Sequence, residues 1–189
     1  MKGPLSKFIE IIGGGTPKRS EDRYWNGKIP WVTPAELKKL DNIFINDTLR
    51  KITDEGLQNC SASLLPINSI LFSSRAPIGH IAINTVPMTT NQGFKSFIAN
   101  KSIVEPIYLY YWLNYNREFL QTMGVGATFK ELSKNLISSI KINLPSLDKQ
   151  HVFVKKINSL HKIKIDKKKI LLKHLKFIAS LQQESFGIN

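Results

Sequence analysis

The sequence predicts an α+β protein, with a mixed α/β globular domain at residues 1–147 and one long C-terminal helix at residues 148–189. Two observations lead to this fold class. In residues 1–147, short apolar runs alternate with stretches rich in glycine and proline. This pattern is typical of short strands and helices connected by turns. From Ser146 to Glu184 the chain has neither proline nor glycine, which favours a single uninterrupted helix capped by Ser146.

The first half of the domain is expected to begin with a short apolar segment, Leu5–Ile12, that stops at three glycines. Ile29–Thr33 is rich in β-branched and aromatic residues and predicts a strand. Pro30 favours an edge position for that strand, because proline cannot donate a hydrogen bond to a neighbour. Thr53 is expected to cap a short helix that reaches Asn59.

In the second half of the domain, the sequence predicts two paired strands, Ser69–Ser74 and His80–Asn84. A turn at Ala76–Gly79 is expected to join them, because proline and glycine favour chain reversal. The hydrophobic pattern then changes from strand-like to helix-like at Pro106. The remaining predicted elements are a strand at Gln92–Ala99, an amphipathic helix at Pro106–Met123 and a short strand at Lys141–Leu144.

The long helix carries two apolar faces separated by lysines. Such a helix either contacts two different neighbours or packs into a single bundle, and the pattern leaves both open. Lys164 and Lys168 interrupt the wider face near its middle. That wider face includes Ile157, Leu160, Leu171, Leu172, Leu175 and Ile178.

Charge is distributed unevenly along the chain. The sequence has 27 Lys and Arg against 14 Asp and Glu, a net charge of +13. Residues 148–189 contribute +7 of it, with ten lysines against Asp148, Asp166 and Glu184. A surplus of this size favours a polyanionic partner, with nucleic acid as the leading case, although it also serves solubility.

Several classes of protein are disfavoured. A single cysteine, Cys60, excludes an internal disulfide and a cysteine-rich zinc site. No apolar run reaches the ~18 residues of a membrane span, so we expect a soluble, cytoplasmic protein with no membrane partner. Asp22, followed by Glu36-Leu37-Lys38, is loosely like a metal-dependent nuclease site in which two carboxylates hold Mg²⁺, a pattern short enough to arise by chance.

Candidate nucleic-acid contacts gather in loops. Consecutive glycines at Gly13–Gly15 either form a flexible turn or bring backbone N–H groups to a phosphate. Arg75 offers a planar, two-pronged cation, and Thr89–Gln92 supplies short side chains of the kind that read base edges or bind phosphates. The predicted contacts are Thr16, Lys18, Arg19, Ser74, Arg75, Thr90, Asn91, Gln92 and Lys130.

Taken together, these segments resemble the specificity subunit of type I restriction–modification systems. The motifs that carry the resemblance occur in the family's order and cover nearly the whole chain, which makes the combination far more specific than any single motif. They are Gly14–Pro17, Tyr24–Pro34, Ser73–Gly79, Thr90–Lys95, Gly126–Ser133, Asn143–Pro145 with Gln150, and Ser180–Phe186.

The resemblance implies that residues 1–147 form a target recognition domain that reads one half of a bipartite site in double-stranded DNA. The helix would act as a ruler and dock modification subunits. Family members usually carry two such domains and two such helices, so this chain looks like a half-length form that pairs as an antiparallel, coiled-coil-like homodimer. The expected dimer interface is Ile157, Leu160, Leu171, Leu172, Leu175 and Ile178, and base-reading residues are expected in stretches such as Asp41–Ser63.

The resemblance also implies that the chain is not catalytic and binds neither a metal nor a cofactor. S-adenosylmethionine, ATP and Mg²⁺ would belong to its partners, the DNA adenine methyltransferase (modification) subunits and the restriction/translocase subunit. Two alternatives remain open: a solitary DNA-binding or regulatory module without methyltransferase partners, and the metal-dependent nuclease.

Overall fold

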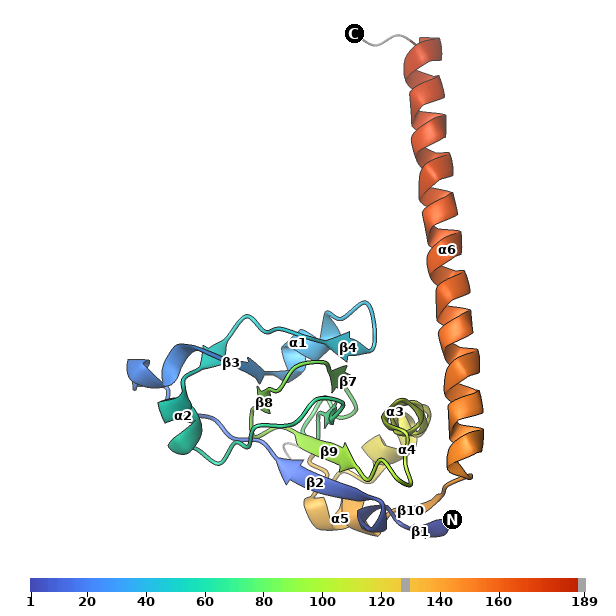
Figure 1. The fold of residues 1–189 in the computed structure, drawn as a ribbon. Coiled ribbons are helices and arrows are strands. Elements are labelled where there is room, and N and C mark those ends of the chain that lie inside the picture. Colours follow the sequence, from blue (N-terminus) through green and yellow to red (C-terminus); the bar gives the residue numbers. More distant parts are fainter. Residues whose placement is uncertain (127–129, 187–189) are drawn as a thin grey trace. The chain divides into compact units, whose positions relative to one another are not determined.

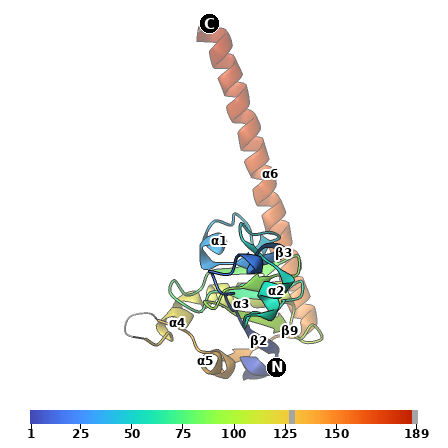
Figure 2. The ribbon, with the colours of Figure 1, turned by 90° about the vertical axis from the view of Figure 1, so that its left-hand side faces the viewer.

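The computed structural model describes residues 1–126 and 130–186, with the backbone alone at 177 and 179–186. The chain divides into two compact units, Met1–Gln150 and His151–Asn189. In both views of the first unit, α1 and β3 lie at one end, and α5 and the N-terminus lie at the other (Figures 1 and 2). The α+β fold class predicted from the sequence is confirmed.

A five-stranded sheet forms the centre of the first unit, in the order β2-β9-β6-β7-β4. Its neighbours pair antiparallel except β7 and β4, which are parallel. Apolar side chains from the sheet and the following helices share one core, in which the Phe72 and Phe97 rings lie 5.7 Å apart. The strands are β2 (Ile9–Gly13), β4 (Phe44–Ile45), β6 (Ile70–Phe72), β7 (Ile81–Asn84) and β9 (Lys95–Ala99).

A second sheet contains three strands, β5 (Lys51–Ile52), β3 (Trp25–Val32) and β8 (Thr89–Thr90), with β3 in the middle. The prediction that Pro30 marks an edge strand is therefore wrong. Pairing with β8 involves only Trp31 and Val32, after the proline, so the missing N–H costs no ladder bond on that side.

The first and last strands of the unit pair with each other. β1 (Lys2–Pro4) runs antiparallel to β10 (Lys141–Asn143), with Gly3 opposite Ile142. The Leu144 N–H extends the pairing by donating to the Met1 carbonyl oxygen at 2.8 Å.

Short helices connect the strands of the first unit. As the sequence predicts, Thr53 caps one of them, and its hydroxyl accepts a hydrogen bond from the Gly56 N–H at 3.0 Å. The helices are α1 (Pro34–Lys38), α2 (Asp54–Gln58), α3 (Pro106–Tyr115), α4 (Arg117–Thr122) and α5 (Lys134–Ser139), with 3₁₀ turns η1 (Leu5–Lys7) and η2 (Asp22–Tyr24).

The single helix predicted at Pro106–Met123 is two helices, α3 and α4, that meet at Asn116. Asn116 has φ −89° and ψ 14°, outside the helical region. Its side-chain amide donates to the Trp112 carbonyl oxygen at 2.8 Å. A side chain that competes with the backbone for such a carbonyl is a recognised cause of helix ends, and it explains the break.

The long helix is α6, Leu147–Phe186, with 40 residues and thus a length of about 60 Å. Its first turn is anchored to the domain by Gln150, whose side chain is fully buried. The Gln150 amide accepts from the Glu105 N–H at 2.9 Å and donates to the Ile103 and Pro145 carbonyl oxygens. In the described part of the chain, no helix is long and apolar enough to cross a membrane.

Candidate nucleic-acid interface

The glycine loop packs directly against β8. A Cβ atom on Gly14 would collide with the Asn91 carbonyl oxygen, so only glycine permits this approach. The Gly15 N–H donates to the Thr90 carbonyl oxygen at 2.9 Å, and the Thr16 hydroxyl donates to the Gln92 side-chain oxygen. The Gly15 N–H is therefore not available to a phosphate, and Gly14 and Gly15 serve close packing.

Two buried tryptophans, Trp25 and Trp31, hold the same loop through hydrogen bonds to its backbone. The Trp31 indole N–H donates to the Gly15 carbonyl oxygen at 2.9 Å, and the Trp25 indole N–H donates to the Lys18 carbonyl oxygen at 3.3 Å. The two rings pack edge to face, with centroids 5.2 Å apart. The loop that carries Lys18 is thus fixed at two of its carbonyl groups.

Two further predicted loops adjoin the end of β8. The Ser74 N–H donates to the Gly93 carbonyl oxygen at 2.8 Å, which joins the loop after β6 to the loop after β8. The Leu132 N–H donates to the Ser74 carbonyl oxygen at 2.8 Å, and the Ala76 N–H donates to the Lys130 carbonyl oxygen at 3.2 Å. Four segments that are distant in sequence therefore form one continuous set of loops.

Arg75 is held in this set of loops by an ion pair with Glu131. Its Nε lies 2.9 Å from Glu131 Oε2, and Lys95 Nζ lies 3.2 Å from Glu131 Oε1. Partial burial of Glu131 opposes its ionisation, but the hydrogen bonds from Arg75 and Lys95 outweigh it, so the pKa of Glu131 lies below its ordinary value. The Arg75 side chain is 47% exposed, so the ion pair orients it without burying it.

The predicted contact residues differ in accessibility. Lys18, Arg19, Arg75, Gln92 and Lys130 are exposed, and Thr16 and Asn91 are half-buried. The Asn91 side-chain oxygen accepts from the Gly93 N–H at 2.9 Å and shapes its own turn. Residues 127–129 of the predicted Gly126–Ser133 motif lie outside the described residues.

Two predicted contacts are corrected by burial. Ser74 is 0% exposed and Thr90 is 2% exposed. The Ser74 hydroxyl donates to the Gly93 carbonyl oxygen at 3.2 Å, inside the protein. Neither side chain reaches the surface, so both belong to the support of the loops rather than to a contact with DNA.

The carboxylate of Glu36, half of the nuclease-like pattern, is occupied by local backbone. One oxygen accepts from the Thr33 N–H at 2.7 Å, in a capping box at the start of α1, and the other accepts from the Leu49 N–H at 2.9 Å. Among residues 1–126 and 130–186, no group of three or more His, Cys, Asp or Glu side chains could hold a metal ion. The geometry gives Glu36 a structural role.

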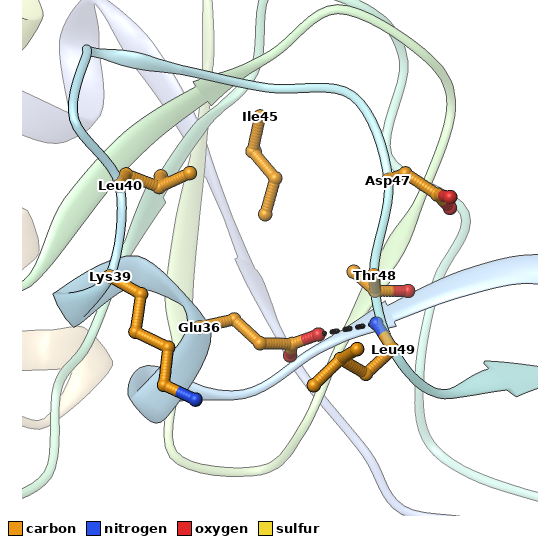
Figure 3. A pocket seen from close by; sticks show the side chains of 7 residues that line it. All are labelled: Glu36, Lys39, Leu40, Ile45, Asp47, Thr48 and Leu49. Carbon is orange, nitrogen blue, oxygen red and sulfur yellow. Dashed lines mark hydrogen bonds between the residues drawn. The ribbon is translucent and has the colours of Figure 1, made fainter. Parts of the chain in front are cut away.

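The same carboxylate lines a surface pocket of about 430 Å³ (Figure 3). Its hydrogen bond to the Leu49 backbone crosses one side of the pocket, and the Asp47 side chain points away from Glu36. The lining residues are Glu36, Lys39, Leu40, Ile45, Asp47, Thr48 and Leu49.

Sequence reasoning missed Lys95 and Glu131 as parts of the site. Glu131 is 56 residues from Arg75, and Lys95 belongs to a strand that the apolar pattern explains without it. Their role depends on how loops meet across the fold, and no local pattern reports that. Of the six predicted dimer residues of α6, Leu160, Leu171, Leu172, Leu175 and Ile178 are 50–59% exposed, whereas Ile157 is half-buried.

Comparison with known proteins identifies the family. The family model described as "Type I restriction modification DNA specificity domain" matches residues 1–176. The MjaIX type I restriction enzyme specificity subunit of Methanocaldococcus jannaschii is 39% identical over 143 residues, which is 75% of this chain and 33% of that protein. The chain thus spans about a third of the length of this relative.

Solved structures agree at the level of the fold. A chain from a study of complex assembly and conformational transition in a type I R-M system aligns over 97% of this chain and 44% of its own length, with a TM-score of 0.71 and 22% identity. The HsdS subunit of Thermoanaerobacter tengcongensis aligns over 98% of this chain and 39% of its own, with a TM-score of 0.65 and 20% identity. With its family match extending from the first strand into α6, this chain belongs to the type I restriction–modification DNA specificity domain family.

Proposed function

We propose that this chain is the non-catalytic specificity component of a type I restriction–modification complex and binds double-stranded DNA in a sequence-specific manner. In this role it positions partner methyltransferase and restriction subunits on a bipartite site. The observation that carries the proposal is the convergence of four loops with exposed basic and amide side chains in a chain of this family. Such side chains supply both phosphate contacts and base-edge contacts.

The long helix pairs two copies of the chain in this proposal. Leucine and isoleucine side chains on one face of α6 are about half exposed, and burying each would contribute roughly 1.5–3 kcal/mol. Two identical chains that pair antiparallel form a two-fold contact. Their domains would then read identical half-sites in inverted orientation, with centres about one DNA turn, ~34 Å, or somewhat more apart.

The chemistry belongs to the partners. S-adenosylmethionine would bind the modification subunits, ATP would bind the restriction/translocase subunit, and Mg²⁺ would also bind partner subunits rather than this chain. Adenine must leave the base stack to be methylated, so a modification subunit would flip a base inside the half-site that this chain positions. The complex would act in the cytoplasm.

The test is a map of N6-methyladenine in the genome of cells that express the chain with its modification subunit. The expected result is methylation at an interrupted palindrome that disappears when the gene for this chain is deleted and returns on complementation. A chain carrying Arg23→Ala, at an exposed arginine already paired with Glu21 and Glu55, serves as the complementation control. Methylation that is unchanged by the deletion would contradict the proposal.

A further inference from the structure

Arg50 forms cation–π contacts with Trp25 and Trp31, the two tryptophans that hold the glycine loop. Its guanidinium carbon lies 4.0 Å from the centre of the Trp25 ring and 5.0 Å from the centre of the Trp31 ring. Both indoles are buried, at 9% and 1% exposure, whereas Arg50 is exposed. A cation over the faces of aromatic rings is held by the electrostatic field of the ring electrons.

This stacking leaves the hydrogen-bonding capacity of Arg50 unused. A contact with the ring electrons uses none of the five N–H donors that a guanidinium carries, and no hydrogen bond of the Arg50 side chain is found among the described residues. Among the described residues, Arg50 forms no ion pair, in contrast to Arg23 and Arg75, which each contact glutamate. Its charge therefore lies against two aromatic rings and has no carboxylate partner in the part of the chain that the structure describes.

The backbone that carries Arg50 is also fixed. The Trp31 N–H lies 3.1 Å from both the Arg50 carbonyl oxygen and the Thr48 hydroxyl, and that hydroxyl donates to the Arg50 carbonyl oxygen at 2.6 Å. The Leu49 N–H donates to Glu36 across the pocket (Figure 3). Because the segment is already ordered, binding through Arg50 costs little further conformational entropy.

The tryptophan pair links Arg50 to the predicted DNA-contact loop. Trp25 and Trp31 donate their indole N–H groups to the carbonyl oxygens of Lys18 and Gly15, so one rigid pair positions both the glycine loop and the guanidinium. An exposed guanidinium that contacts the tryptophan pair, and that has no ion-pair partner among the described residues, fits a ligand that presents two adjacent acceptor atoms. DNA presents such pairs at the guanine O6 and N7 atoms and at phosphate oxygens.

We infer that Arg50 contacts DNA as a two-pronged donor and that the stacking on Trp25 and Trp31 orients it for this contact. The inference rests on the proposed function, because it assigns a residue of the same DNA-binding surface. It places one contact inside the stretch Asp41–Ser63, where no motif marks the residues that read the site.

The test uses the full chain and a library of random-sequence DNA duplexes, from which the wild-type protein enriches its preferred sequence. Affinity is then measured for the enriched duplex and for unselected duplexes, with the wild type, Arg50→Lys and Arg50→Gln. Arg23→Gln is the matched control, because Arg23 is also exposed and also near an aromatic ring, 5.2 Å from the Tyr24 centroid, but is paired with glutamates. Circular dichroism and thermal unfolding verify that each variant is folded.

We expect Arg50→Gln to weaken binding to the enriched duplex about tenfold or more, and Arg50→Lys to weaken it substantially as well, because lysine keeps the charge but lacks the planar fork. If the variants lose the preference for one particular base of the enriched sequence and keep the preferences at its other positions, Arg50 contacts a guanine. Equal loss on all duplexes, with a salt slope smaller by about 0.9, identifies a phosphate contact. Arg50 variants that bind as the Arg23→Gln control does would overturn the inference, whereas a wild type that enriches no sequence would overturn the proposed function itself.

Discussion

Arg75 and Glu131 are joined twice although 56 residues separate them: their backbones form an isolated antiparallel bridge, and Arg75 Nε lies 2.9 Å from Glu131 Oε2. Nε is one of five donors of the guanidinium. The ion pair therefore sets the direction of the side chain and leaves the terminal N–H groups to a further acceptor. This relationship makes Arg75 the first residue to test in the predicted interface.

Arg75→Ala is expected to weaken binding to the cognate duplex by about 1–3 kcal/mol, because a two-pronged contact is lost. The measurement is a fluorescence-anisotropy titration of the full chain at fixed salt concentration. Arg23→Ala, which removes an exposed arginine already paired with Glu21 and Glu55, is the control. Equal affinities of the Arg75 and Arg23 variants would show that Arg75 only supports the fold.

Lys18→Ala is expected to weaken binding to all duplexes alike. The Lys18 side chain is 70% exposed and 3.2 Å from Glu21, and an exposed pair of this kind is weak enough for a phosphate to displace it. Loss of one phosphate contact lowers the slope of log affinity against log salt by about 0.9. Titrations at several salt concentrations measure the slope, and an unchanged slope would remove Lys18 from the interface.

Lowering the pH is expected to remove the contribution that Glu131 makes to the free energy of unfolding. Its pKa in the folded chain lies below the ordinary 4.5, so its contribution is present above pH 4.5 and is lost as the pH falls through the folded-state pKa. Glu131→Gln should therefore lower the free energy of unfolding by about 0.5–1 kcal/mol at neutral pH, with a smaller difference in acid. Urea unfolding of both proteins at neutral pH and well below pH 4.5 measures this. A difference that is constant with pH would contradict it.

Leu172→Asp combined with Leu175→Asp is expected to convert a dimer of the chain into monomers, because two charges would be placed in an apolar contact. Sedimentation at micromolar concentration should report twice the chain mass for the wild type and the chain mass for the variant. Asn158→Asp with Ser159→Asp adds the same charges away from the leucine face and should leave the dimer intact. A wild type that stays monomeric, alone and on DNA carrying both half-sites, would refute the pairing.

Gln150→Ala is expected to lower the free energy of unfolding by about 1–3 kcal/mol, since it removes a fully buried side chain and leaves the partly buried Glu105 N–H without its side-chain acceptor. The exposed neighbour provides a control, because Lys149→Ala should change it by less than about 0.5 kcal/mol. Thermal or urea unfolding measures both. Equal effects of the two substitutions would show that the buried amide does not stabilise the start of α6.

The features predicted correctly are those that neighbouring residues decide. The cap at Thr53 depends on a backbone N–H three residues ahead, and the uninterrupted α6 follows from the absence of proline and glycine. α5 was missed although it has a local signal, since the Ser133 hydroxyl accepts from the Leu136 N–H at 3.2 Å. A serine before a short apolar stretch is common enough in loops to conceal such a cap.

The features that sequence reasoning could not provide depend on distant contacts. Pro30 lies in a central strand because its parallel neighbour begins to pair one residue later. Ser74 and Thr90 are of residue types that also form surface contacts with DNA in general, and only the assembled loops show that both are buried. The family resemblance located the loops, but the accessibility of each side chain within them follows from packing.

The pairing of β1 with β10 has a consequence for how this domain can be combined with others. Because the polypeptide enters and leaves the first unit along adjacent strands, the unit can be joined into a longer chain, or repeated along one, without rearranging its own core. Exchange of everything between the two strands would replace the predicted DNA-contact loops together with the tryptophan pair that supports them. The unit is therefore built so that the whole set of predicted contact loops can be exchanged between two short, paired strands.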